Sequence, residues 1–141
     1  MKITVGQIMA ANAAINSILA VKRDKPIRAK LTYTLLAAQA ILDPHAEAFE
    51  KARHPLVLEC FDTSKPKEEN GQTVVPPKTK MVDGTEVVDL ELALKFQTEI
   101  GELTGAEVEL AIGQIPIDYL DSVEPAPQPD EIARLMWMLK E

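Results

Sequence analysis

Hydrophobic and polar residues alternate with helical spacing through the first part of the chain. Apolar side chains recur every three or four residues from Val5 to Val21, which predicts an amphipathic helix over about residues 5–21. Thr4 and Gln7 have the spacing of a capping box, in which each side chain accepts a hydrogen bond from the other residue's backbone N–H. The chain is therefore expected to enter this helix at Thr4.

A second apolar stripe follows a short polar break at residues 22–25. Pro26 stands where the first turn of a helix tolerates proline, because the missing N–H would have no partner there. The stripe consists of Ile27, Leu31, Leu35, Ala38 and Leu42. Because the break is so short, we expect the two helices to form an antiparallel hairpin.

Two prolines divide the sequence that comes next. Asp43-Pro44 has the pattern of a helix start, with Asp43 as the cap, so a further helix is predicted around Phe49. Pro55 is expected to bend or end that helix near His54, since proline lacks an N–H and clashes with the preceding turn.

The middle of the chain is rich in proline, glycine and charge. This composition predicts an exposed loop over residues 63–80, with a short strand at 73–75. Asp83-Gly84 lies between two apolar pairs and predicts a small hairpin.

A helix is predicted over about residues 89–103, with Gly105 in the left-handed conformation just past its end. The alternation at Glu107–Ile112 is typical of a strand. Ile115–Ile117 can extend it, at a sheet edge because Pro116 cannot donate to a ladder.

Three prolines at residues 125–129 predict a stiff, extended linker, after which Asp130 is expected to cap a final helix. The predicted fold is an α+β, mainly helical single domain over residues 1–124, with a helical hairpin at the N-terminus and a small β element. The linker 125–129 and a C-terminal helix over 130–141 follow it. We expect one helical core cluster to hold Ile8, Ile15, Leu31, Leu35, Phe49 and Leu94.

Composition adds that the core must be aliphatic, because 46% of the residues are hydrophobic and only 4% are aromatic. Charge is unevenly placed. Residues 1–60 carry eight Lys/Arg and five Asp/Glu, whereas residues 61–141 carry seven Lys/Arg and 17 Asp/Glu. The acidic half is either ordinary solvated surface or a docking face; the candidate docking residues are Glu99, Glu102, Glu107 and Glu109.

The sequence holds no recognisable set of residues for catalysis. His45 and His54 lack partners with metal-ligand spacing, and the single Cys60 has no base nearby in sequence and excludes an intrachain disulfide. We therefore expect a protein that is not an enzyme and that has no cofactor or metal.

Two classes of partner are not favoured. No apolar run reaches the length of a membrane-spanning helix. A nucleic-acid footprint normally belongs to a basic domain, whereas this chain has a pI near 4.9. Its one basic cluster, between Lys22 and Lys30, has only Tyr33 as a nearby ring.

The final helix carries more apolar residues than one core-facing stripe needs. Leu135 to Leu139 form an unbroken run in which Met136, Trp137 and Met138 are the candidate partner-binding residues. The alternatives are that the run completes the core of its own domain, or that it anchors a protein partner or a second copy of the chain.

Several short segments together resemble a family of small tailed-bacteriophage proteins of unknown function. They are the start at Met1–Thr4 with Gln7 and Ile8, Pro26-Ile27 with Tyr33 and Leu35, the run Phe49–Arg53, Asn70-Gly71 with Val75–Pro77, Glu107–Leu110 and the closing Asp130–Leu139. The resemblance implies phage origin and a late-gene or accessory role, in the host cytoplasm or the virion. It implies no catalytic residues.

The predicted function is a non-enzymatic, phage-type protein–protein interaction protein, a virion (tail) assembly or accessory component. The alternative is an acidic phage inhibitor that docks on a host enzyme or defence complex, with carboxylates that imitate nucleic-acid phosphates. The protein partner would be a phage structural protein or a host protein.

Overall fold

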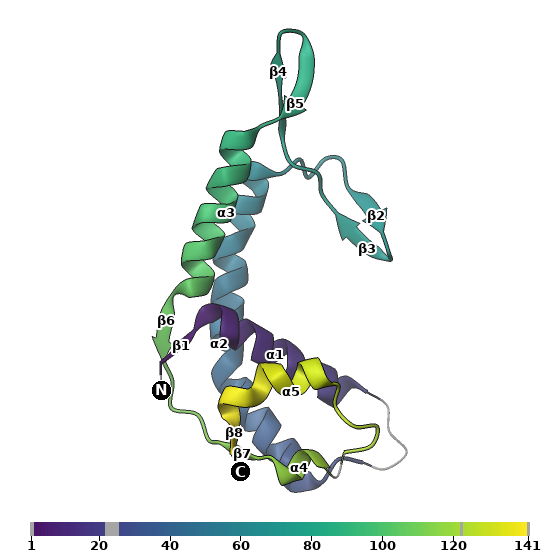
Figure 1. The fold of residues 1–141 in the computed structure, drawn as a ribbon, viewed down its shortest axis with the longest axis vertical. Coiled ribbons are helices and arrows are strands. Elements are labelled where there is room, and N and C mark those ends of the chain that lie inside the picture. Colours follow the sequence, from purple (N-terminus) through teal and green to yellow (C-terminus); the bar gives the residue numbers. More distant parts are fainter. Residues whose placement is uncertain (1, 22–25, 122, 141) are drawn as a thin grey trace. The chain divides into compact units, whose positions relative to one another are not determined.

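The computed structural model describes residues 2–21, 26–121 and 123–140 (Figure 1). The chain is an α+β domain, mainly helical, with a helical hairpin at its N-terminus and small β elements. It packs into two compact units. Unit 1 comprises Met1–Ala48 and Thr104–Glu141, and unit 2 comprises Phe49–Leu103.

Unit 1 holds the helices α1 and α5, the first part of the long helix α2, and short elements between them. Their bounds are β1 (Lys2–Thr4), α1 (Val5–Ala20), α2 (Ala29–Cys60), β6 (Glu107–Glu109), β7 (Ile115–Pro116), α4 (Asp118–Asp121), α5 (Pro129–Leu135), the 3-10 helix η1 (Met136–Met138) and β8 (Leu139–Lys140).

The start of α1 confirms the predicted capping box. The Gln7 backbone N–H donates to Thr4 Oγ1 at 3.2 Å, and the Thr4 N–H donates to Gln7 Oε1 at 3.1 Å. Directly before this cap, β1 pairs antiparallel with β6. A Cβ on Gly6 would lie 3.2 Å from the Thr104 carbonyl oxygen, so the small residue permits this close approach.

Two polar contacts join α1 and α2, and the order of the contacting residues along α1 is the reverse of their order along α2. Asn12 Nδ2 donates to Asp43 Oδ1 at 3.1 Å, and one turn further along α1 the Gln39 side chain donates to Asn16. These contacts confirm the predicted antiparallel hairpin. The predicted break at residues 22–25 lies outside the described residues.

An aliphatic core fills unit 1. Four of the expected core residues, Ile8, Ile15, Leu31 and Leu35, are fully buried in it, together with residues of β7 and the C-terminal segment. Two expectations need correction. Phe49 is buried but lies in unit 2, and Leu94 is 64% exposed.

Helix α2 corrects the predictions made from the two prolines. It continues through Pro44 and Pro55 to Cys60, so Asp43-Pro44 starts no new helix and Pro55 does not end one. Each proline leaves the carbonyl four residues earlier without its usual donor. Both prolines, and the residues Ala40 and Lys51 that carry those carbonyls, lie on the solvent side, where water can satisfy the freed oxygens.

The C-terminal segment is also shorter in helix than predicted. Pro129 is the first residue of α5, and the Gln128 N–H donates to Glu131 Oε1 at 2.8 Å, so the cap is Gln128 rather than Asp130. After Leu135 the chain tightens into η1 and then forms β8. Strand β8 pairs in parallel with β7, so Ile115-Pro116 does not extend β6.

Unit 2 combines the end of α2 with two hairpins and one helix. Its further elements are β2 (Lys67–Glu69), β3 (Gln72–Val74), β4 (Thr79–Val82), β5 (Thr85–Val88) and α3 (Leu90–Gly105), whose last two residues, Thr104 and Gly105, belong to unit 1. The Asp83-Gly84 hairpin was predicted; of the other, only the strand near residues 73–75 was predicted. Both turns have positive φ at their two central residues, as type I′ turns require.

In unit 2, backbone hydrogen bonds join the end of α2 and the residues after it to the segment that follows β3. The Asp62 N–H donates to the Pro76 carbonyl at 2.8 Å, and the Lys78 N–H donates to the Cys60 carbonyl at 3.1 Å. The residues after α2 are thereby held against the residues that follow β3.

Helix α3 packs on the end of α2 through one face. Lys95 Nζ lies 2.5 Å from Glu59 Oε1, and the rings of Phe61 and Phe96 meet edge to face at 4.8 Å. Leu94 belongs to the opposite face, which explains its exposure. Gly105 corrects another prediction, because it is the last residue of α3 and has no positive φ.

The neighbouring Leu35 and Leu36 allow a matched test of the core. Leu35 is fully buried, whereas Leu36, one position along the same helix, is 52% exposed. We expect Leu35→Ala to lower the free energy of unfolding of unit 1 by about 2–5 kcal/mol, and Leu36→Ala to change it by less than about 0.5 kcal/mol. Urea unfolding followed by the fluorescence of Trp137, the single tryptophan, reports this directly. Equal costs would contradict the burial assigned to Leu35.

Candidate functional site

The C-terminal segment separates the three residues predicted as a partner anchor. Met138 is fully buried in the core of unit 1, and Trp137 is partly buried against that core. Met136 is 58% exposed. Met138 is therefore a core residue rather than a surface anchor, because α5 lies along α1 and the strand that follows it is held by β7 (Figure 1). Partner binding by Met136 and Trp137 stays a prediction.

The four acidic candidates fall into both units. Glu99 and Glu102 lie on α3, where Glu99 is half-buried and Glu102 is exposed. Glu107 and Glu109 lie on β6, and both are exposed. As alternate residues of a strand these last two share a face, opposite Thr4 and Lys2 of β1. A docking role for any of these carboxylates stays a prediction.

Arg28 and Lys30, the two residues of the basic cluster that the structure describes, have an aromatic neighbour that the local sequence does not reveal; Lys22, Arg23 and Lys25 lie outside the described residues. The ring of Tyr119, from α4, lies 5.4 Å from the Arg28 guanidinium carbon and 5.7 Å from Lys30 Nζ. Cations at this distance are attracted to the face of the ring. The tyrosine is far from the cluster in sequence, so only the fold brings the three together.

Residues typical of metal sites do not gather within the part of the chain that the structure describes, where no three His, Cys, Asp or Glu side chains come together. His54 is exposed and His45 is partly buried, both on α2. Among the described residues, no helix combines the length and apolar character needed to cross a bilayer.

Unit 2 carries an apolar surface that the sequence analysis missed. Of the 13 large hydrophobic residues exposed among those described, eight lie in this unit, whereas only two of the 18 buried hydrophobic residues do. The eight are Leu58, Val74, Met81, Val82, Val87, Val88, Leu90 and Leu94. We call them the exposed apolar set of unit 2.

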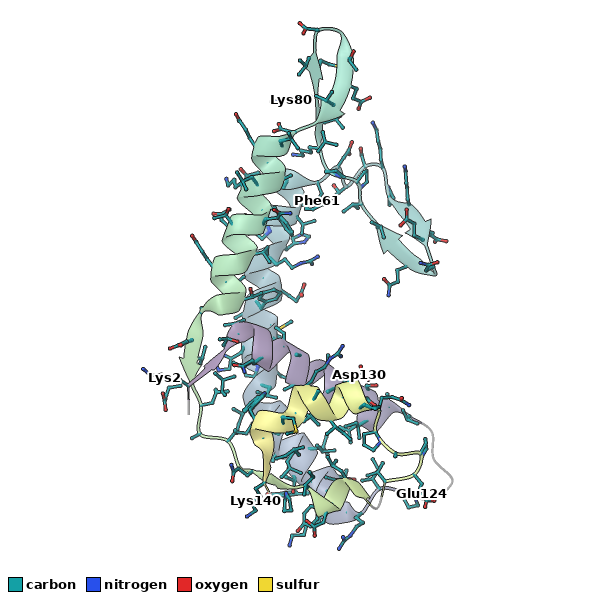
Figure 2. All side chains as sticks on the ribbon, in the orientation of Figure 1. Lys2, Phe61, Lys80, Glu124, Asp130 and Lys140 are labelled. Carbon is teal, nitrogen blue, oxygen red and sulfur yellow. The ribbon has the colours of Figure 1, made fainter. Side chains whose placement is uncertain are left out.

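The β4–β5 hairpin contributes half of this set. Its register places Val82 and Val87 on one face and Met81 and Val88 on the other, and all eight residues of its two strands are exposed. The hairpin side chains point away on both sides in Figure 2, where Lys80 marks β4. An isolated two-stranded hairpin is marginally stable in water, so this one is a natural candidate for burial by a partner.

A pocket of about 250 Å³ lies between the end of α2, β3 and α3. Val57 of α2, Phe61 directly after α2 and Phe96 of α3 line one side of it. Val74 and Val75 line it from β3 and the residue after that strand. Arg53 adds one cation. A signal for this site was present in the sequence: Arg53, Val57 and Phe61 are spaced by four, so they share one face of a helix if the helix continues past Pro55.

Cys60, the last residue of α2, carries a buried thiol, and the exposed fraction of the residue is 1%. Burial raises the pKa of the Cys60 thiol above its ordinary value of 9.0, and the adjacent Glu59 carboxylate raises that pKa further. The thiol is therefore held in its unreactive protonated form at neutral pH.

The two methionines that flank Trp137 give a test of the C-terminal segment. We expect Met138→Ala to lower the free energy of unfolding by about 2–5 kcal/mol because it leaves a cavity, and Met136→Ala to change it by less than about 0.5 kcal/mol. Urea unfolding followed by circular dichroism compares the two variants. A large loss of unfolding free energy for Met136→Ala and none for Met138→Ala would contradict the assignment of Met138 to the core.

Cys60 gives a test of pH dependence. Because the thiol pKa is higher in the folded state, the unfolded state loses its proton first once the pH exceeds about 9, and stability falls as the pH rises. We expect the wild type to lose more stability than Cys60→Ala between pH about 8 and pH about 10. The variant keeps every other titrating group, so the difference between the two urea midpoints isolates the thiol. Equal losses would show that its pKa is not raised.

Comparisons with protein-family models, with curated proteins and with solved structures each find no match. The resemblance to tailed-bacteriophage proteins therefore stays a prediction, and the candidate sites rest on the geometry and chemistry of this chain.

Proposed function

We propose that this chain is a non-enzymatic, phage-type interaction protein that takes part in virion assembly, as a tail component or an accessory factor, and that unit 2 is the part that binds its protein partner. The observation that supports the proposal most is the exposed apolar set of unit 2. Large apolar side chains that are exposed together in one unit favour an interaction role, because water disfavours their exposure and association removes them from it.

The unequal burial of apolar side chains in the two units supports the same proposal. Unit 1 holds 16 of the 18 buried hydrophobic residues among those described, so it supplies most of the apolar burial that stabilises the fold. Unit 2 buries only Phe49 and Cys60 among the described hydrophobic residues. Association would remove the remaining apolar side chains of unit 2 from water, at about 25 cal/mol per Å² of apolar area.

The test uses the β4–β5 hairpin and particles of the phage that encodes the chain. We expect the chain in purified particles or in assembly intermediates, and roughly tenfold less of Val82→Thr/Val87→Thr, because each substitution replaces an apolar methyl by a hydroxyl at the interface. Threonine keeps the strand preference, so the hairpin should persist. Quantitative mass spectrometry of the particles measures the incorporation.

The matched control is Val21→Thr/Ile117→Thr, which changes two unit 1 residues that are 41% and 40% exposed, against 44% and 38% for Val82 and Val87. We expect it to be incorporated like the wild type. If the chain is absent from particles and intermediates and instead co-purifies with a soluble host complex in a salt-sensitive manner, the proposal is wrong and the acidic inhibitor takes its place.

A further inference from the structure

The pocket of unit 2 has fixed apolar walls. Phe61 and Phe96 meet edge to face with an angle of 84° between their ring planes, a favourable arrangement that holds both rings in place. Val57 precedes Phe61 by one turn of α2, and Val75 faces them from the chain after β3. Figure 2 marks Phe61 at the end of α2.

The size of the pocket decides what kind of occupant fits. Pockets for whole small molecules typically measure about 300–1,000 Å³. This one, at about 250 Å³, falls below that range and is open to solvent. It therefore suits one bulky apolar side chain whose backbone stays outside.

Arg53 places a positive charge at the pocket, which is complementary to a carboxylate on an occupant. It lies one turn before Val57, and its guanidinium is 3.5 Å from the Glu50 carboxylate. The side chains of this pair are 44% and 58% exposed, so the pair contributes little stability and can be rearranged. A guanidinium has five donors, which leaves capacity for a second carboxylate.

Strand β3 supplies an edge beside the pocket. It pairs with β2 on one side, and within the described parts of the chain no strand pairs with its other side. An extended peptide can add to such an edge through its backbone and direct alternate side chains to the same face. Thr73, Val74 and Val75 all line the pocket, so a peptide bound along this segment would lie over its opening.

We propose that the pocket of unit 2 binds an extended peptide segment of the protein partner, with one bulky apolar side chain of the peptide in the pocket and a neighbouring Asp or Glu of the peptide on Arg53. This assignment rests on the proposed interaction function and names the chemistry of the partner segment: a bulky aliphatic or aromatic residue within two positions of an acidic one.

The experiment selects binders from a random peptide display library on the whole protein. The wild type should enrich peptides with the apolar–acidic pattern. The reversal Arg53→Glu should weaken binding of a synthetic peptide of that pattern by about tenfold or more, since a hydrogen-bonded charge pair is replaced by repulsion. In a fresh selection, Arg53→Glu should favour Lys or Arg at the position where the wild type favours Asp or Glu.

Arg134→Glu is the matched control. Arg134 is 47% exposed and lies one helical turn from the carboxylate of Asp130, but it belongs to unit 1. Arg134→Glu changes the net charge by the same amount as Arg53→Glu, and it should leave the selected peptide pattern and the peptide affinity unchanged. An equal loss in both variants would show a general effect of charge and would overturn the assignment of Arg53.

A second variant tests the apolar walls. Val57→Trp should fill the pocket and abolish binding of the same peptide, with the helical circular dichroism signal retained. Val75→Lys tests the opposite wall if Val57→Trp does not fold. Peptides that bind both wall variants like the wild type would overturn the proposal.

Titration with dodecanoate separates a peptide site from a lipid site. Saturable dodecanoate binding that Val57→Trp abolishes, in the absence of any enriched peptide, would overturn the proposal in favour of an acyl-chain ligand. Particle incorporation combined with failed peptide selection would overturn the pocket assignment alone. Peptide selection without particle incorporation would overturn the virion role and leave the pocket assignment standing.

Discussion

The aliphatic core of unit 1 is the interaction on which the rest of the molecule depends. Ile8 and Ile15 from α1 meet Leu31 and Leu35 from α2 without exposure to water, and Met138 joins them from the C-terminal segment. Non-directional burial of this kind is the dominant favourable term in folding. Unit 2 has little of it, so its shape depends instead on backbone pairing, two glycine-containing turns and the contact between α2 and α3.

This contrast explains which parts of the structure were predictable. The capping box of Thr4 and the Asp83-Gly84 turn are local, because the chemistry that fixes them lies within a few residues. The stripes of α1 and of the first part of α2 have helical period and one clear buried face. The fold class and most of the core follow from these features.

The errors have a common physical origin in tertiary context. Prolines at positions 44 and 55 read as boundaries, yet a helix tolerates them where the freed carbonyls face water. Leu94 has the same spacing pattern as core residues, but α3 packs through its Phe96 face and leaves Leu94 exposed. Sequence spacing shows that two residues share a face; it does not show which face is covered.

The same limit applies to the candidate site. Arg53, Val57 and Phe61 share a face by spacing alone, whereas Phe96 and Val75 join them only through long-range packing. Met138 appeared available to a partner because the sequence cannot reveal that β7 and β8 hold the segment against the core. Functional surfaces assembled from distant segments are the part that needs the three-dimensional structure.

Unit 1 is discontinuous along the chain, since Phe49–Leu103 stands between its two segments. This order has a consequence for biosynthesis. The ribosome completes all of unit 2 before it delivers Leu110, Leu135 and Met138, which unit 1 needs to close its core. During synthesis the apolar faces of α1 and α2 therefore stay uncovered until the C-terminal segment is made, and transiently exposed apolar surface makes a partly folded chain prone to aggregation. A chain that stops before the C-terminal segment lacks Leu135 and Met138 and leaves this core incomplete, and exposed hydrophobic surface of that kind is what chaperones and proteases act on in cells.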